Sequence, residues 1–167
     1  MSGAFEFTPE KRREFEEILK RYPVKRAALL PTLYLAQAQN GYISPEAEVY
    51  VGKLLDVPLV DVREVLTFYT LFHRRPPGRH HIRVCTSLSC WIRGSDAIKA
   101  HLESELGVAS GGVTEDGTFS WEAVPDCLGA CELAPMMQVD DDYQGNLTSA
   151  QLDQVLAALL EDEKEHP

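Results

Sequence analysis

The chain has 167 residues, of which 44% are hydrophobic, and a net charge of −10, a size that suits one domain or two small ones. Residues 1–79 carry twelve Lys/Arg and ten Asp/Glu, net +2, whereas residues 80–167 carry four and sixteen, net −12. Because the acidic second half would repel nucleic-acid phosphates, we expect no nucleic-acid partner. The first residues lack the pattern of a secretory signal, and no apolar run approaches the roughly 20 residues of a membrane span. We therefore expect a soluble cytosolic protein without direct membrane insertion.

Four amphipathic patterns in the first half predict short helices. The first pattern covers residues 9–22, and the apolar positions of all four recur with the spacing of one helix face. Caps, first-turn prolines and a glycine stop mark their boundaries at Thr8–Pro9, Asn40–Gly41, Ser44–Pro45 and Pro58. Pro31 implies that the second helix starts late or bends. The four helices predict an N-terminal helical bundle over residues 1–75.

A proline-rich stretch separates this bundle from the rest of the chain. Pro76 and Pro77 stiffen it and Gly78 follows, which predicts a linker over residues 76–79. Just before it, three aromatic residues could form a docking patch for a partner, but core packing is the favoured interpretation. The three aromatic residues are Phe68, Tyr69 and Phe72.

Residues 80–167 alternate between strand and helix patterns. Strands are predicted at 82–85, 119–124 and 136–139, a helix at about 92–107, a turn at 140–145, and a last helix after Thr148. This order predicts a small α/β domain over residues 80–167. His80 and His81 precede the first strand, and we expect them at the surface.

The only four cysteines form two short pairs, C-x4-C and C-x3-C. Four soft thiolates suit an iron–sulfur cluster or a structural zinc ion. Zinc ribbons normally use C-x2-C pairs, so the spacing favours a [2Fe–2S] cluster, with zinc and disulfides as alternatives. The pairs are Cys85 with Cys90, and Cys127 with Cys131.

Polar residues and a helix start lie near the first pair. Cys90 is predicted at or just before a helix N-terminus, where backbone N–H groups favour a thiolate. Thr86, Ser87 and Ser89 are possible hydrogen-bond donors to sulfur. Other site types lack support, because the sequence shows no G-x-G-x-x-G or phosphate-binding loop, no thioredoxin-type C-x-x-C and no Rieske Cys-x-His pair. We therefore assign no catalytic residue and expect no NADH-oxidising site in this chain.

Several motifs together resemble one family. The cysteines stand in Cys85-x4-Cys90 and in Cys127-Leu-Gly-Ala-Cys131-x-x-Ala-Pro135, followed by Tyr143 and Leu147-Thr148. Upstream, Gln39-Asn40-Gly41-Tyr42-Ile43-Ser44-Pro45 and Thr67-Phe68-Tyr69 also fit. The resemblance, over about residues 10–160, is to the thioredoxin-like [2Fe–2S] subunit of NADH:quinone oxidoreductase, respiratory complex I. Asp140 departs from the pattern, which has asparagine there.

The resemblance implies a fold, a cofactor and partners. The fold class would be α+β or α/β, with an N-terminal helical bundle followed by a thioredoxin-like [2Fe–2S] ferredoxin domain. Cys85, Cys90, Cys127 and Cys131 would hold the cluster, which exchanges electrons with FMN on the NADH-binding subunit. Further iron–sulfur subunits would lie nearby, and the complex would sit at the cytoplasmic, inner face of the membrane. NAD-linked hydrogenases and formate dehydrogenases contain the same module, and a zinc-stabilised non-redox interaction module is the alternative from another class.

Overall fold

The chain divides between Pro76 and Pro77 into two compact units, here called the helical unit and the sheet unit. The computed structural model describes residues 4–165, with side chains as far as Glu161. Each unit has its own hydrophobic core. Helices followed by a mixed sheet with helices confirm the predicted order of a helical bundle and an α/β part. Within the described residues, every helix is too short or too polar to cross a bilayer.

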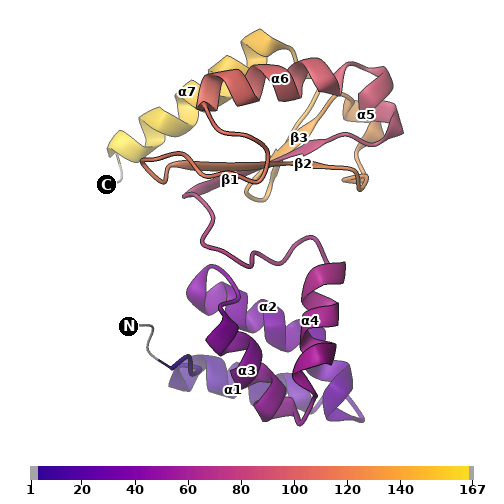
Figure 1. Ribbon diagram of the computed structural model, residues 1–167, viewed down its shortest axis with the longest axis vertical. Helices are drawn as coiled ribbons and strands as arrows, with labels where there is room; N and C mark the ends of the chain where they lie inside the picture. The colour runs from indigo at the N-terminus through magenta and orange to yellow at the C-terminus, as the bar shows by residue number, and fades with distance from the viewer. Residues whose placement is uncertain (1–3, 166–167) are drawn as a thin grey trace. The chain divides into compact units, whose positions relative to one another are not determined.

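Over residues 4–76, the helical unit contains four α-helices and one 3₁₀ turn (Figure 1). Thr8 caps the first helix by accepting a hydrogen bond from Lys11 N at 3.2 Å, and Ser44 caps the third by accepting one from Ala47 N at 3.2 Å. Gly41 ends the second helix with φ 78°, a conformation that glycine adopts without strain. The elements are α1 (Pro9–Leu19), η1 (Lys25–Ala28), α2 (Leu29–Asn40), α3 (Pro45–Leu55) and α4 (Leu59–Phe68).

Two boundaries of the helical unit refine the sequence expectations. The first helix ends at Leu19 rather than at residue 22. The second helix starts late, at Leu29, so Pro31 falls in its first turn. There an N–H has no partner within the helix, so proline removes nothing from it.

The core of the helical unit is built from the predicted apolar faces. Phe15, Leu33, Val51 and Val62 come from four different helices and are almost fully buried. The aromatic residues at the end of α4 and just after it only partly follow the expectation of core packing. Phe72 is buried, but Phe68 is 75% exposed and Tyr69 39% exposed, because the helix ends at Phe68 and the chain turns away there.

The described part of the sheet unit, residues 77–165, has four strands in the order β2-β1-β3-β4. β1 pairs with β2 in parallel and with β3 antiparallel, and β3 pairs with β4 antiparallel. Figure 1 shows α6 and α7 on the same face of this sheet. The elements are β1 (His80–Cys85), α5 (Leu88–Ile92), α6 (Ser95–Leu106), β2 (Phe119–Val124), η2 (Cys131–Leu133), β3 (Met137–Val139), β4 (Asp142–Gln144) and α7 (Ser149–Glu165).

The helix-covered face of the sheet forms the second core. Ile82 and Val84 of β1, Trp121 of β2 and Met137 of β3 alternate onto this face, as the period of two in a strand requires. They pack against Ile98 and Leu102 of α6 and against Leu152 and Leu156 of α7. The four cysteines lie outside this core, at the end of β1 and in the segments that follow β1 and β2.

The expectation that both histidines lie at the surface needs a correction. His81 lies with Arg83 on the opposite, polar face of the sheet, whereas His80 alternates with Ile82 onto the helix-covered side, and its ring centroid lies 5.9 Å from that of Phe119. The side chains of His80 and His81 are only 18% and 17% exposed, because β1 is an inner strand. Asp140 hydrogen-bonds to His80 Nδ1 at 2.8 Å and accepts from the His81 backbone N–H at 2.8 Å. Asp140 has φ 52°, a left-handed conformation that Asp and Asn tolerate better than most residues.

Candidate metal centre

The first cysteine pair spans the end of β1 and a one-turn helix. Cys85 is the last residue of β1, and Cys90 is the third residue of α5; both are buried. Cys90 therefore lies in the first turn of a helix, near an N-terminus as predicted, but that helix begins at Leu88 rather than at about residue 92. The predicted helix 92–107 is two helices, separated at Gly94, which has φ 94° and directly precedes α6.

The second cysteine pair lies in the loop after β2 and is exposed. The Sγ atoms of Cys127 and Cys131 are 3.4 Å apart. Gly129 has φ 85° and donates its N–H to Cys127 Sγ at 3.4 Å. A glycine at this position lets the loop turn back so that the backbone faces its own sulfur.

The four thiols converge at one end of the sheet. Cys90 interacts with Cys85 and with Cys131, and Cys131 interacts with Cys127 and with Cys85. Cys85, Cys90, Ala130, Ala134 and Met136 form a small apolar cluster separate from the main core. The structure therefore brings the predicted residues of both pairs together, with one pair buried and the other facing solvent.

The thiols differ in acidity because their surroundings differ. Burial, with added effects from Cys85, raises the pKa of Cys90 to about 11. The hydrogen bond from Gly129 N–H lowers the pKa of Cys127, and the hydrogen bond with Cys127 raises the pKa of Cys131. The raised pKa values of Cys90 and Cys131 disfavour their thiolates, and a bound metal would offset this by its own positive charge.

Two of the three proposed hydroxyl donors do not reach sulfur in this structure. The Thr86 hydroxyl donates to Val124 O at 2.9 Å, and Ser87 occupies the position before α5. Ser89 is the hydroxyl that interacts with Cys131. The backbone N–H of Met136 additionally points to Cys90, so the surroundings of the sulfurs contain backbone as well as side-chain donors.

Two residues that sequence reasoning gave no role hold the cysteine loop in place. The Tyr143 hydroxyl of β4 donates to Leu128 O at 2.7 Å. Arg93 donates from Nε to Ala134 O at 3.3 Å. The motif around Tyr143 was visible in the sequence, but its contact across 15 residues depends on β4, which was predicted only as a turn.

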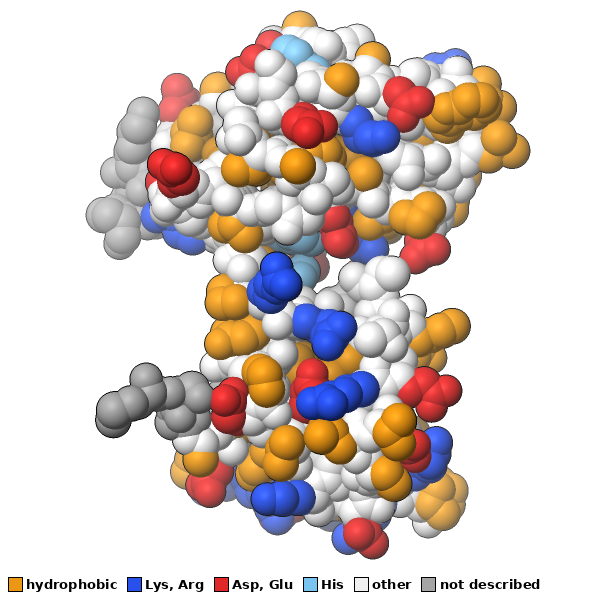
Figure 2. Space-filling model, viewed as in Figure 1, with side chains coloured by type: hydrophobic (Ala, Val, Ile, Leu, Met, Phe, Trp, Pro, Cys, Tyr) orange, Lys and Arg blue, Asp and Glu red, His pale blue; other side chains and the backbone are white. Residues whose placement is uncertain are grey.

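An exposed apolar patch lies beside the buried pair. Leu88, Trp91 and Ile92 are 67%, 57% and 69% exposed. They surround Cys90 on α5, so the short helix turns its cysteine inward and its large apolar side chains outward. Figure 2 shows hydrophobic side chains gathered at this end of the sheet unit. We call these three residues the α5 patch.

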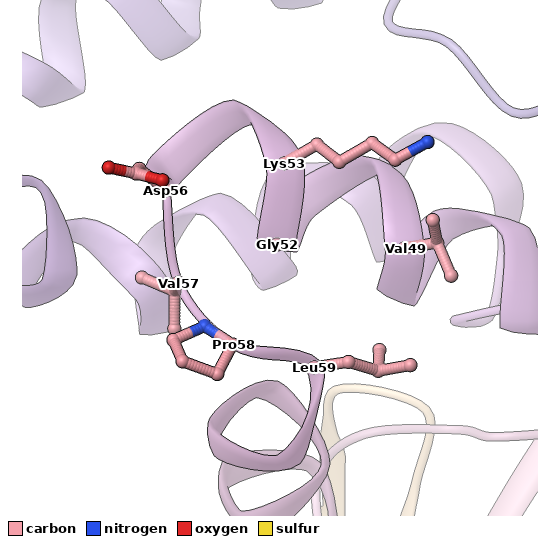
Figure 3. A pocket seen from close by; sticks show the side chains of 7 residues that line it. All are labelled: Val49, Gly52, Lys53, Asp56, Val57, Pro58 and Leu59. Carbon is pink, nitrogen blue, oxygen red and sulfur yellow. The ribbon is translucent and has the colours of Figure 1, made fainter.

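A separate hollow lies in the helical unit between the end of α3 and the start of α4. Figure 3 shows its lining, which is mostly apolar, with Val49, Val57 and Leu59 among the seven residues. The charged side chains of Lys53 and Asp56 extend in opposite directions. Because its charged groups diverge, this hollow lacks the converging polar groups typical of a small-molecule site.

Comparison with known proteins agrees with this site. The model of the family described as thioredoxin-like [2Fe-2S] ferredoxin matches residues 15–160. The NADH-quinone oxidoreductase E 2 subunit of Rhizobium meliloti (strain 1021) is 47% identical over 145 residues, which cover 87% of this chain and 86% of the relative. The NADH-quinone oxidoreductase E subunit of Rickettsia bellii (strain RML369-C) is 43% identical over 150 residues, covering 88% and 89%.

A solved structure supports the fold. A chain of an air-oxidised NAD+-reducing [NiFe]-hydrogenase superposes with a TM-score of 0.66 at 21% identity, covering 83% of this chain and 24% of the hydrogenase chain. This likeness concerns the fold alone, and this chain spans about a quarter of that hydrogenase chain. The predicted thioredoxin-like fold, the family resemblance and the [2Fe–2S] cofactor class are all confirmed by the family match. The chain belongs to the thioredoxin-like [2Fe-2S] ferredoxin family.

Proposed function

We propose that this chain is the electron-carrying subunit of an NADH:quinone oxidoreductase and holds a [2Fe–2S] cluster on Cys85, Cys90, Cys127 and Cys131. The convergence of these four thiols within a chain of this family supports the proposal most directly. The two NADH-quinone oxidoreductase relatives, from Rhizobium meliloti and Rickettsia bellii, support the parent complex. A [2Fe–2S] cluster supplies one-electron transfer and gains one negative charge when it is reduced.

The arrangement of the cysteines in pairs suits two metal ions better than one. Two thiolates on one tetrahedral metal, with metal–sulfur bonds of about 2.3 Å, lie roughly 3.8 Å apart. The 3.4 Å between Cys127 Sγ and Cys131 Sγ is close to this separation. We assign one iron to the exposed pair and the other to the buried pair of Cys85 and Cys90.

The protein groups around the sulfurs would stabilise the added negative charge. Gly129 N–H points to Cys127, Met136 N–H to Cys90, and the Ser89 hydroxyl interacts with Cys131. Hydrogen bonds to sulfur favour the reduced state and raise the reduction potential. The surplus of acidic residues after residue 79 acts in the opposite direction, so we expect a low-potential centre.

The partner that exchanges electrons with this cluster is, in our proposal, the subunit that carries FMN and binds NADH. Electron transfer slows steeply with distance, so the partner must dock near the cysteines. The α5 patch offers an apolar surface there that includes Trp91, and aromatic anchors dominate binding energy at protein interfaces. Further iron–sulfur subunits would follow in the same complex, which we place at the cytoplasmic, inner face of the membrane.

Metal analysis separates a [2Fe–2S] cluster from zinc. Protein made anaerobically with ample iron should contain two irons and two acid-labile sulfides per chain and show a rhombic EPR signal after dithionite reduction. Cys131→Ser should abolish this signal, whereas Glu132→Gln, an exposed neighbour that supplies no thiolate, should keep it. Stoichiometric zinc without iron would instead establish the non-redox interaction module.

The α5 patch can be tested with the purified partner subunit. Leu88→Ser with Trp91→Ser should weaken binding to the FMN-carrying subunit at least about tenfold, because large apolar side chains then leave the interface. Leu160→Ser on α7, which is 40% exposed, is the matched control and should bind as the wild type does. Equal binding of all three proteins would move the interface elsewhere. Affinity purification of this chain tests the parent complex. Recovery of hydrogenase or formate dehydrogenase subunits in place of NADH:quinone oxidoreductase subunits would assign the chain to one of those complexes instead.

A further inference from the structure

Three metal-ligating side chains meet where α6 and α7 lie together. His101 and Glu105 stand four residues apart on α6 and so share one face of that helix. Asp153 approaches them from α7. One possible ligand atom from each of the three side chains lies within 4.8 Å of the other two.

The core beneath these residues fixes the two helices that carry them. Leu102 and Leu152, the chain neighbours of His101 and Asp153, are both 0% exposed and belong to one core cluster. The His101 side chain is only 26% exposed, and its Nε2 lies 2.6 Å from Asp153 Oδ1. The imidazole is therefore already directed at the carboxylate, so binding a ligand there costs little additional side-chain entropy.

The donor set matches a particular class of cation. One imidazole nitrogen and two carboxylate oxygens suit zinc and similar first-row divalent ions. The two carboxylates also balance the charge of a divalent cation. In addition, residues 80–167 carry sixteen acidic and four basic residues, a surplus that attracts cations to this unit.

The distances require only small adjustments. Zinc bonds of about 2.0–2.2 Å to nitrogen and oxygen place tetrahedral ligand atoms roughly 3.4 Å apart. The contact of 2.6 Å between His101 and Asp153 would lengthen, and the exposed Glu105 side chain would rotate inward. Both changes are side-chain rotations.

We propose that His101, Glu105 and Asp153 form a binding site for a divalent transition-metal cation, with zinc as the best fit, that fastens α7 to α6. The cation takes the place of the hydrogen bond between His101 Nε2 and Asp153 Oδ1, and the neutral imidazole then carries its ring proton on Nδ1. Water completes the coordination. The site uses elements other than those that carry the four cysteines.

The competing explanation is a plain ion pair between His101 and Asp153, with Glu105 nearby by chance. The two explanations differ in what they expect of Glu105. An ion pair gives Glu105 no effect on zinc affinity, whereas a metal site loses one of its three protein ligands when Glu105 is changed.

Isothermal titration with zinc on the full-length, metal-loaded protein distinguishes them. With the cysteines already occupied, the wild type should bind one further zinc per chain, with a Kd of about 1–100 µM. Glu105→Gln and Asp153→Asn should each weaken this binding at least about tenfold. Glu103→Gln, the same change at an exposed position on the same helix, should leave the affinity unchanged. Iron and sulfide analysis after the titration checks that zinc has not displaced the metal on the cysteines.

Thermal unfolding gives a second measurement. Zinc should raise the Tm of the wild type and of Glu103→Gln, because a ligand that binds the folded state stabilises it. It should leave the Tm of His101→Gln unchanged. Equal zinc affinity in the wild type, Glu105→Gln and Asp153→Asn would overturn the proposal in favour of a plain ion pair. The proposal would also be overturned if the metal-loaded wild type bound no further zinc.

Discussion

At the scale of single residues, two exposed acids stand next to the exposed cysteine pair. Asp126 precedes Cys127 and Glu132 follows Cys131. If each carboxylate lies about 8 Å from the charge added on reduction, the two unit charges repel each other by roughly 0.5 kcal/mol in water. For a one-electron couple this energy corresponds to a change of about 20 mV in the midpoint potential. We therefore predict that Asp126→Asn with Glu132→Gln raises the midpoint potential by about 40 mV. Redox titration followed by EPR measures this change.

Salt provides the internal control for this prediction. Because both acids are exposed, added salt should screen their effect and bring the potentials of the variant and the wild type together. Asp96→Asn with Glu103→Gln on α6 removes the same charge elsewhere in the sheet unit and should change the potential less. If the midpoint potential of the variant at low salt equalled that of the wild type, the hydrogen bonds from Gly129 and Met136 to sulfur would be the main determinants of the potential.

The sequence predicted which residues form the site better than it predicted how they are held. Cysteine identity and spacing were sufficient to single out four converging thiols. Whether Thr86 or Ser89 reaches a sulfur depends on where β2 and the loop that follows it lie. The Thr86 hydroxyl donates to Val124 O of β2, whereas Ser89 interacts with Cys131 in that loop. The contact of Tyr143 with Leu128 likewise depends on a pairing of strands that local sequence does not reveal.

At the scale of elements, side chains of β1 and β2 form an ionic cluster on the polar face of the sheet. Glu122 Oε1 lies 3.6 Å from His81 Nε2 and 3.2 Å from Arg83 Nε, and the Arg83 side chain is only 8% exposed. His81 first, and Arg83 in addition, lower the pKa of Glu122. We predict that Glu122→Gln lowers the free energy of unfolding at pH 7 by about 1 kcal/mol, a value reduced by its partial exposure.

The pH dependence of this effect has a definite sign. A carboxyl group whose pKa is lowered by folding contributes stability above its unfolded pKa, about 4.3, and loses it as the pH falls through the folded pKa. The difference between wild type and Glu122→Gln should therefore be full at pH 7 and shrink below about pH 4. Urea unfolding at several pH values measures it, with Glu115→Gln in the exposed loop as the control. A difference that grew in acid would contradict this assignment.

The elements that the sequence missed are the shortest ones. The helical pattern after Cys90 gave one helix, but Gly94 in a left-handed conformation divides it into α5 and α6. β4 has three residues and exists because it pairs with β3, so its own residues, which follow an Asp-rich stretch, indicate only a turn. Long amphipathic patterns such as those of α1, α3 and α7 were recognisable because packing and local preference agree there.

At the scale of the whole molecule, the two units differ in charge and in the origin of their cores. The helical core draws on residues from Phe5 to Phe72, and the sheet core on residues from Ile82 to Leu159. Gly78 donates to Ser120 Oγ at 2.9 Å and Arg79 N to Gly117 O at 3.0 Å. We therefore propose a boundary at Pro76–Pro77, because the residues that follow already bind to β2 and to the residue two positions before it.

Separate cores lead to the prediction that each unit folds on its own. A fragment of residues 77–167 should take up the same amounts of iron and sulfide as the full chain and give the same EPR signal, because the cysteines and the residues that hold their loop all lie within it. A fragment of residues 1–76 should show helical circular dichroism and a cooperative thermal transition, since small domains with their own core can fold alone. Leu102→Ala in the first fragment, which opens a cavity beneath α6 and costs about 2–5 kcal/mol, should remove cooperative folding of that unit. If fragment 77–167 took up the cluster only when fragment 1–76 was added, the two units would form one folding unit. The boundary at Pro76–Pro77 would then divide two compact parts that do not fold independently.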